Sequence, residues 1–273
     1  MSSPVRKLEP VTELKPQPMV AIDDVTMAFG AFVAVQNVNL KVGDGEFLSI
    51  VGPTGCGKST ILNAIAGLLK PAQGKVSIDG TTVQGVQNNI GYLFQQDALL
   101  PWKTAFQNVE LGLMFRGVPE EERRAKVTVW LEKVGLKGFG DRFPHQLSGG
   151  QRKRVQMAQA LITEPKVILM DEPFSALDIH TRHLMQNELL RLWQEDRRAV
   201  VMITHDLEEA IALGDRVVVL AAGPKSRVIE SFPVDLERPR NVAEIKLDSK
   251  FMTLYRDIWA SLRGEVEKSY ASR

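Results

Sequence analysis

The segment at residues 52–60 constrains the fold of this chain more than any other feature of its sequence. It reads GPTGCGKST and matches the phosphate-binding pattern GxxxxGK[ST]. An apolar run, Phe47–Val51, precedes it and predicts a buried strand, and residues 59–66 predict a helix. Strand, glycine loop and helix in this order predict a nucleoside phosphate bound by backbone N–H groups at a helix N-terminus. The alternative interpretation is a glycine-rich turn without a ligand.

Every residue of this loop is a candidate contact for the nucleotide. Lys58 is expected to contact the β and γ phosphates, and the Ser59 hydroxyl is expected to bind Mg²⁺. Cys56 is the single cysteine of the chain, which excludes an internal disulfide and is typical of a reducing compartment. Its alkylation is expected to block nucleotide binding, with the nucleotide protecting it. The other predicted contacts are Gly52, Pro53, Thr54, Gly55, Gly57 and Thr60.

Two carboxylates follow a second apolar run, at residues 167–170, which predicts a strand buried on both faces. Asp171 is expected to be the second protein ligand of Mg²⁺. Glu172 is expected to accept a proton from the attacking water as general base. Two adjacent carboxylates are costly to bury unless a cation and a water need them, so the alternative is a solvated turn.

Composition and charge exclude several classes of protein. The chain has 273 residues, of which 44% are hydrophobic and 25% are charged, values typical of a folded globular protein. Its net charge of +1 gives no reason to expect a nucleic-acid partner. The longest apolar runs fall short of the roughly 20 residues that span a bilayer, so the chain is not expected to cross a membrane by itself.

Further patterns predict an α/β fold with a mostly parallel sheet. The apolar runs at residues 200–203 and 217–220 are typical of strands covered on both faces. Residues 104–138 show helical periodicity and predict a helical insert between strands, and residues 251–262 predict an amphipathic C-terminal helix. That last helix has three candidate contacts: its own domain, a second copy of the chain, or a regulator.

The segment at residues 147–151 reads LSGGQ and lies shortly before the carboxylate strand. It resembles the signature of the ABC (ATP-binding cassette) ATPases, and the resemblance runs from about residue 19 to residue 222. It implies a P-loop NTPase of the ABC type, with an antiparallel β subdomain beside the parallel core and a helical insert. The expected divisions are a flexible N-terminal extension (1–18), an ATPase domain (19–235) with its helical subdomain at about 97–163, and a C-terminal helical extension (236–273).

The resemblance also implies roles for single residues. Phe29 resembles the aromatic residue that stacks on adenine, the alternative being a core phenylalanine. Gln95 is similar to the glutamine that reaches Mg²⁺ or the attacking water, and His205 to the histidine that hydrogen-bonds the γ-phosphate. Asp178 belongs to a segment that resembles the D-loop, which crosses the seam between two copies.

In the family, the LSGGQ motif caps the ATP held by a partner chain, so the resemblance implies a homodimer. Lys153 and Gln159 depart from the Gln and Arg that family members often carry, which leaves the catalytic assignments intact. The residues expected to contact the partner's nucleotide are Ser148, Gly149, Gly150 and Gln151.

Separate membrane subunits of the family insert a short helix beside the glutamine that Gln95 resembles. Residues 95–102, ending in LLPW, are apolar and aromatic enough to receive such a helix, or else pack on the chain's own helical insert. This stretch, residues 238–240 and the C-terminal helix resemble the ATPase subunits of nitrate, sulfonate and taurine importers.

That resemblance implies ATP and Mg²⁺ as cofactors, transmembrane permease subunits and a periplasmic solute-binding protein as partners, and a peripheral location at the cytoplasmic face of the inner (cell) membrane. The alternatives are a soluble ABC ATPase acting outside transport and a non-enzymatic regulator, against which Glu172 argues.

Overall fold

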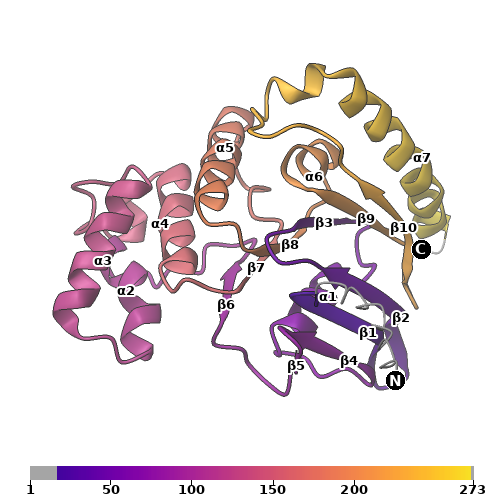
Figure 1. Cartoon of the computed structure of the whole chain (residues 1–273), viewed down its shortest axis with the longest axis horizontal. Coiled ribbons are helices and arrows are strands. Elements are labelled where there is room, and N and C mark those ends of the chain that lie inside the picture. The colour runs from indigo at the N-terminus through magenta and orange to yellow at the C-terminus, as the bar shows by residue number, and fades with distance from the viewer. Residues whose placement is uncertain (1–16, 272–273) are drawn as a thin grey trace, which may run out of the picture.

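The computed structural model describes residues 17–271, which form two β-sheets flanked by helices (Figure 1). Of the N-terminal extension predicted at residues 1–18, residues 1–16 lie outside the described part, and the first strand begins at Val20. Within residues 17–271, no helix combines the length and the apolar character that a bilayer span requires.

The larger sheet has six strands in the order β10-β9-β3-β8-β7-β6. The strands from β9 to β6 are parallel, and β10 pairs antiparallel with β9 at the edge. The mostly parallel sheet predicted from the apolar runs is therefore confirmed. The strands are β3 (Phe47–Val51), β6 (Ile90–Leu93), β7 (Val167–Asp171), β8 (Ala199–Ile203), β9 (Arg216–Leu220) and β10 (Val228–Pro233).

Alternate residues of the central strands enter two different hydrophobic cores. In β3, Leu48 and Ile50 pack on the side of α1 (Lys58–Ile65), while Phe47 and Val51 pack on the opposite side. All four side chains are fully buried. A strand covered on both faces has no polar side, which is why the sequence shows continuous apolar runs there instead of alternation.

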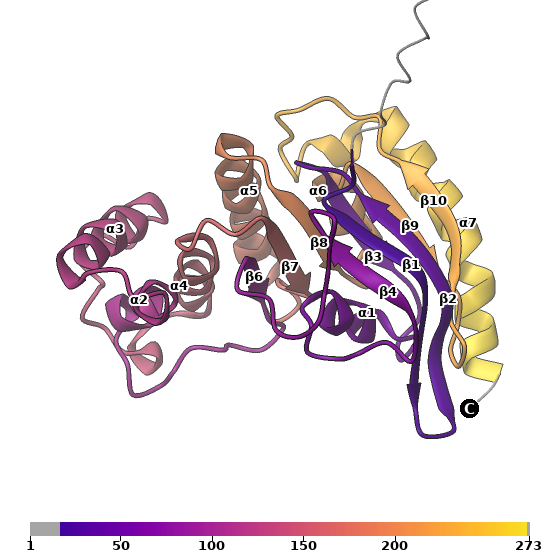
Figure 2. The ribbon, with the colours of Figure 1, turned by 60° about the horizontal axis from the view of Figure 1, so that its bottom comes forward.

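The smaller sheet is antiparallel, with the order β2-β1-β4-β5. Figure 2 shows β1 and β2 as a long hairpin that projects past the larger sheet, with α1 between the two sheets. Phe29 and Phe32 pair where this hairpin turns. The strands are β1 (Val20–Phe29), β2 (Phe32–Val42), β4 (Gln73–Ile78) and β5 (Thr81–Thr82).

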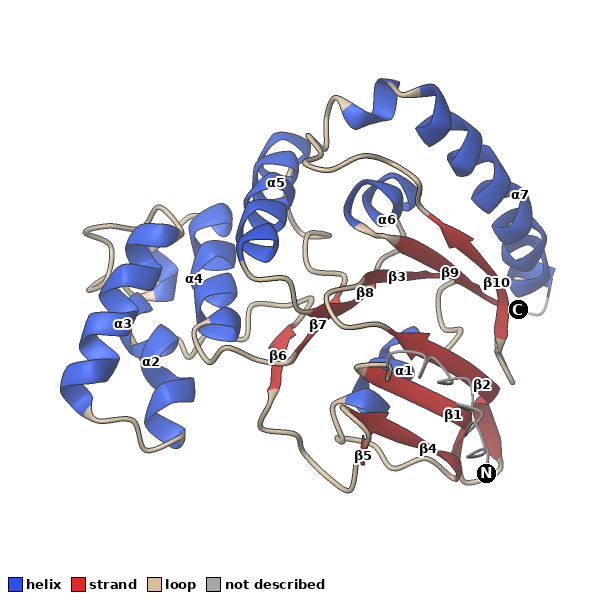
Figure 3. Ribbon diagram, viewed as in Figure 1, coloured by secondary structure: helices blue, strands red, loops and turns tan. Residues whose placement is uncertain are grey.

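Helices α2, α3 and α4 form a separate group beyond the β6 edge of the larger sheet (Figure 3). The helical pattern at residues 104–138 divides into two helices at residues 116–119. Gly117 there adopts a φ of +72°, and Pro119 restricts the residue before it to extended conformations. The three helices are α2 (Ala105–Phe115), α3 (Glu120–Lys133) and α4 (Gly149–Leu161).

Helices α5, α6 and α7 cover the face of the larger sheet opposite α1 (Figure 1). Helix α7 is longer than the 251–262 predicted for it, and its Phe251, Ile258 and Leu262 are buried in the core of its own chain. Packing on its own domain is therefore confirmed among the three candidate contacts. These helices are α5 (Ile179–Glu195), α6 (Leu207–Leu213) and α7 (Ser249–Ala271), with single turns η1 (Pro144–Gln146) and η2 (Ile245–Leu247) between elements.

Candidate functional site

The phosphate loop joins β3, in the middle of the larger sheet, to the N-terminus of α1. Gly57 is the N-cap of α1 with a φ of +96°, and a Cβ there would lie 2.5 Å from Val35 Cγ1. Both the backbone conformation and the close approach require glycine. Lys58 is only 8% exposed, and its Nζ donates to the carbonyls of Gly52 at 2.8 Å and Pro53 at 2.9 Å. The ammonium group thus lies inside the turn of the loop.

The Cys56 thiol lies on the inner side of this loop, where it is 1% exposed. Burial is the largest influence on it and raises the pKa of the thiol above its ordinary value. Alkylation of Cys56 therefore requires the loop to open and the thiol to ionise in an apolar environment.

Asp171, at the end of β7, and Ser59, in α1, bring two oxygen ligands together. Their side chains are hydrogen-bonded, and burial raises the pKa of the Asp171 carboxyl. A hydroxyl and a half-buried carboxylate fit the oxygen coordination that Mg²⁺ prefers, and a bound cation would favour the ionised carboxylate.

Glu172, His205 and Gln95 lie together, as the resemblance implies. Glu172 Oε2 is 3.1 Å from His205 Nδ1 and accepts a hydrogen bond from Gln95 Nε2 at 3.2 Å. The three residues follow β7, β8 and β6, which are neighbouring parallel strands whose carboxyl ends meet at one edge. The Glu172 backbone has a φ of +43°, and its N–H donates to the Ile203 carbonyl at 2.9 Å, which fixes the turn after β7.

Phe29 lies at the end of the β1–β2 hairpin and is 49% exposed. The alternative that Phe29 is a core residue is therefore wrong. An exposed ring beside a turn is free to stack on a ligand.

The LSGGQ motif is placed differently from the residues above. Ser148 is exposed and caps α4: its Oγ accepts from the Gln151 N–H at 3.2 Å, and Gln151 Oε1 accepts from the Ser148 N–H at 2.9 Å. Among the hydrogen bonds and ion pairs of residues 17–271, none joins the motif to the phosphate loop. Gly149 has room for a Cβ, whose nearest contact would be Leu177 Cδ2 at 3.7 Å.

Asp178 is the N-cap of α5 and accepts from the N–H groups of His180 at 3.1 Å and Thr181 at 3.0 Å. Hydrogen bonding to Thr181 is the main reason that its pKa is lowered. Asp178 is fully exposed, and the side chain of its neighbour Ile179 is largely exposed. An exposed cap beside an apolar side chain suits a segment at an interface.

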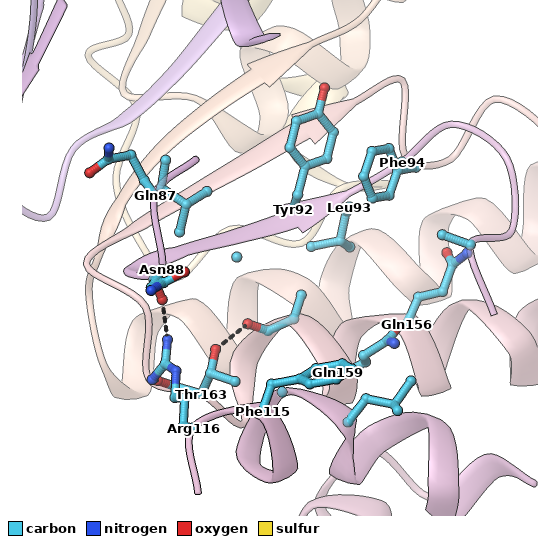
Figure 4. A pocket seen from close by; sticks show the side chains of 16 residues that line it. Gln87, Asn88, Tyr92, Leu93, Phe94, Phe115, Arg116, Gln156, Gln159 and Thr163 are labelled. Carbon is cyan, nitrogen blue, oxygen red and sulfur yellow. Dashed lines mark hydrogen bonds between the residues drawn. The ribbon is translucent and has the colours of Figure 1, made fainter. Parts of the chain in front are cut away.

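A pocket of about 600 Å³ lies between β6 and the group of helices α2 and α4 (Figure 4). Phe115 and Arg116 from the end of α2 and Gln159 from α4 face it, and Phe94 lies at its border just before Gln95. Phe115 is 81% exposed. Among the described residues that line the pocket, Arg116 is the single charged side chain.

The stretch at residues 95–102 packs in part on the chain's own helical insert, the second of the two interpretations given to it. Leu99 is buried against the helical group, whereas Trp102 is 70% exposed. Asp97 Oδ2 accepts a hydrogen bond from Arg152 Nε at 2.6 Å, and Arg152 also donates to the Leu147 carbonyl at 2.7 Å. The segment after Gln95 is therefore linked directly to the LSGGQ motif.

Sequence reasoning missed these links, and it treated Lys153 only as a departure from the family pattern. Lys153 is 3% exposed, and its Nζ donates to the Phe94 carbonyl at 3.4 Å, immediately before Gln95. Burial lowers the pKa of this amine. A charged residue three and four positions before Gln156 and Met157, on the buried face of α4, was the available signal.

The parallel sheet carries a phosphate loop after β3, two carboxylates after β7 and a histidine after β8. These features define a P-loop protein equipped for nucleotide hydrolysis. Residues 35–175 match the family model described as "ABC transporter".

Two relatives and one solved structure show the similarity in detail. The nitrate import ATP-binding protein NrtD of Synechocystis is 42% identical over 89% of this chain and 93% of its own length. The taurine import ATP-binding protein TauB of Pseudomonas putida is 46% identical over 79% of this chain and 84% of its own. A dimeric ATP-binding cassette, solved in a post-hydrolysis state with ADP and Pi, has a TM-score of 0.69 at 38% identity, over 80% of this chain and 100% of that one.

The chain belongs to the ABC transporter ATP-binding family, binds ATP and is an ATPase. The fold class and the family resemblance carried by LSGGQ are both confirmed, as is the similarity to nitrate- and taurine-type importer ATPases.

Proposed function

We propose that two copies of this chain close around two MgATP molecules and drive solute uptake through separate permease subunits. The solute is a small anion of the nitrate, sulfonate or taurine type. The observation that supports the uptake role most is the similarity to NrtD and TauB over most of the chain.

Each ATP is held by the phosphate loop of one copy and the LSGGQ motif of the other. Gly149 supports this division, because its φ is not positive and its own chain leaves room for a Cβ. Glycine at this position is explained if a phosphate of the partner's nucleotide approaches the backbone. The solved ADP- and Pi-bound cassette is dimeric, which supports the pairing of two copies.

We assign the chemistry to residues at the carboxyl ends of β6, β7 and β8. Glu172 accepts the proton of the attacking water, while Gln95 and His205, both within hydrogen-bond reach of Glu172, orient the reacting groups. Lys58 holds the β and γ phosphates, and the ring of Phe29 stacks on adenine. Ser59, Asp171 and Gln95 would hold Mg²⁺, which neutralises phosphate charge when bound.

The permease docks a short helix in the pocket between β6 and the α2–α4 group. Phe115, which is exposed and lines the pocket, offers an apolar contact, and the exposed Trp102 lies outside the lining at the end of residues 95–102. Arg116 donates to the Asn88 and Thr163 carbonyls, and its positive charge favours an acidic or helix C-terminal partner group. Docking here would place the chain at the cytoplasmic face of the inner membrane as a peripheral subunit, with a periplasmic binding protein on the other side and no nucleic-acid partner. We retain 19–235, 97–163 and 236–273 as the divisions of the chain.

Uptake of a labelled anion into vesicles tests the proposal. Permease and chain are reconstituted together, and uptake of nitrate, taurine and an alkanesulfonate is measured with ATP supplied on the side of the chain. We expect ATP-dependent uptake of at least one of the three, and its loss with Glu172→Gln, because a general base contributes about 10² to 10⁴ in rate.

A matched pair of surface variants tests the docking pocket. Phe115→Asp is expected to abolish co-purification with the permease, whereas Leu247→Asp, at a position 87% exposed and outside the pocket lining, is expected to preserve it. Stable association with ribosomes or DNA instead of a membrane protein would favour the alternative of an ABC ATPase acting outside transport.

A further inference from the structure

A buried network, outside the groups assigned to the reaction, holds the loop that carries His205. Thr204, directly before His205, is 1% exposed, and its N–H donates to the Ile50 carbonyl at 3.2 Å. Thr204 Oγ1 accepts from the Asp206 N–H at 3.0 Å and donates its own hydrogen to Glu209 Oε2. The backbone on both sides of His205 is therefore fixed through one hydroxyl group.

Glu209 lies in α6 and is 5% exposed. Its second oxygen, Oε1, accepts a hydrogen bond from Gln186 Nε2 at 2.9 Å, and Gln186 is a 2% exposed residue of α5. Burial is the main influence on Glu209 and raises the pKa of its carboxyl. Burying a carboxyl group costs free energy unless hydrogen bonds satisfy it. The Glu209 carboxyl is buried where it joins the loop after β8 to helix α5.

Helix α5 is linked to the same loop a second time, through Arg182. One arm of its guanidinium, Nη2, donates to the Leu177 carbonyl at 3.0 Å, and the other, Nη1, lies 3.5 Å from Asp206 Oδ2. The N-cap of α5 is Asp178, the fully exposed residue of the D-loop-like segment. Two sets of contacts thus connect the first half of α5 with the residues around His205.

We propose that Glu209 is a positioning residue for His205: by joining Thr204 to Gln186, it makes the His205 loop and helix α5 one rigid unit. The inference rests on the proposed function, in which His205 orients the reacting groups at a site shared by two copies, and it places the exposed cap Asp178 at the seam between them. Closure that displaces Asp178 then displaces His205 with it, so the histidine reaches its working position when the partner is in place.

The test compares variants of Thr204, whose hydroxyl is the link to the loop, in the full-length chain. Thr204→Val is nearly isosteric and is expected to lower kcat for ATP hydrolysis on the order of tenfold, while KM for ATP changes by less than about twofold. Thr204→Ser keeps the hydroxyl and is expected to retain kcat within about threefold of the wild-type value. Glu209→Ala is expected to reproduce the loss seen with Thr204→Val.

Repeating the series in a His205→Ala background distinguishes the positioning of His205 from a purely structural role. If Glu209 and Thr204 act through His205, Thr204→Val lowers kcat there by less than about twofold, because the group it misplaces is already gone. The matched control is Glu208→Ala, which removes a 48% exposed neighbour in α6 whose Oε2 lies 2.6 Å from Lys246 Nζ; it is expected to leave kcat unchanged.

Independent, multiplicative losses from Thr204→Val and His205→Ala would overturn the inference, as would a Thr204→Ser chain as impaired as Thr204→Val. Wild-type kcat in Thr204→Val, with His205→Ala impaired, overturns the inference but leaves the proposed function standing. Wild-type kcat in His205→Ala overturns the proposed role of His205 and the inference together. If Glu209→Ala does not fold, the two Thr204 variants still decide the outcome.

Discussion

Two helix N-termini in this chain carry glycine-rich anion-binding sequences, and their surroundings differ. At the start of α1, Lys58 is buried and bonded to the carbonyls of its own loop. At the start of α4, Ser148 is exposed, and its hydrogen bonds among residues 17–271 stay within its own helical turn. At the first N-terminus the ammonium group lies inside its own loop, whereas at the second the nearby guanidinium of Arg152 is bonded to Asp97 and to the Leu147 carbonyl, and the cap residue Ser148 is exposed.

One glycine of each motif, Gly57 and Gly149, differs in the same way. Gly57 is required by its own chain, since it has a positive φ and a Cβ would collide with Val35. Gly149 is not required by its own chain, which leaves ordinary van der Waals space for a Cβ. The glycine at position 57 is thus explained by its own chain, whereas the glycine at position 149 is not. This contrast supports a site shared between two copies.

The largest effect that separates the two motifs is expected from Ser148→Ala. If Ser148 contacts the partner's nucleotide, turnover falls by about 10² to 10³, the loss typical of removing a donor aimed at developing charge. The helix cap is also lost, at about 1 kcal/mol. ATP binding by the isolated chain, measured by calorimetry, stays at the wild-type level because the phosphate loop is intact.

Thr104→Ala is the matched control for this variant. Thr104 caps α2 through the same reciprocal arrangement with Gln107. It is expected to lower the free energy of unfolding by about the same 1 kcal/mol without the loss of turnover. Equal loss of turnover in both variants would mean that Ser148 acts only as a helix cap.

The next largest difference expected between the two N-termini is in the alkylation rate of a thiol at each of them. Because the pKa of buried Cys56 is raised, its thiolate fraction at pH 8 is below that of a free cysteine, and its alkylation is expected to be slow and to accelerate as the pH rises. A thiol introduced by Ser148→Cys in a Cys56→Ser chain is exposed at a helix N-terminus and is expected to react at least about tenfold faster.

Iodoacetamide kinetics followed by mass spectrometry measure both rates, with and without ATP. Protection by ATP is expected for Cys56 in the isolated chain, and for the thiol at position 148 only under conditions where copies associate. Fast alkylation of Cys56 at pH 8 would contradict a closed loop.

Variants of two exposed aromatic residues at the turn of the β1–β2 hairpin test the expected contact with adenine. Phe29→Ala is expected to weaken ATP binding roughly tenfold, because base stacking on an aromatic ring contributes about 1–3 kcal/mol. Phe32→Ala is the control, since Phe32 is 54% exposed and pairs with Phe29 across the turn. Equal losses would show that the hairpin, and not the Phe29 ring, contributes to binding.

The smallest effect is expected on stability. Gly149→Ala places a methyl group in ordinary contact at the first residue of α4, so the free energy of unfolding is expected to stay the same or rise by up to about 1 kcal/mol. Denaturant titration measures it. A loss of several kcal/mol would mean that the chain itself requires glycine at this position.

The phosphate loop and the carboxylate pair could be predicted from the sequence because each is a local pattern beside an apolar strand. The residues that assemble the site from distant segments could not. Arg152 and Asp97 are 55 positions apart, and Gln186 and Glu209 are 23 positions apart. No periodicity in these segments predicts either contact. Their pairing is set by the strand order β8-β7-β6 and by how α4, α5 and α6 pack on it.

The C-terminal helix illustrates a different limit. Its apolar positions at Phe251, Ile258 and Leu262 predicted one buried face, and the structure buries that face on its own domain. Its extent to Ala271 was missed, because the last turns carry mostly polar residues that no apolar stripe marks. Hydrophobic periodicity indicates the buried part of a helix and gives no signal for the solvent-exposed part.

Mixing two inactive variants tests the shared site most directly. Lys58→Ala disables the phosphate loop and Ser148→Ala disables the outward motif, so each homodimer has two defective sites. If each site combines the two motifs from different copies, a 1:1 mixture contains heterodimers with one intact site, and turnover recovers to about a quarter of the wild-type value for independent sites. If the mixture shows only the average of the two separate variants, each copy works alone and the account is contradicted.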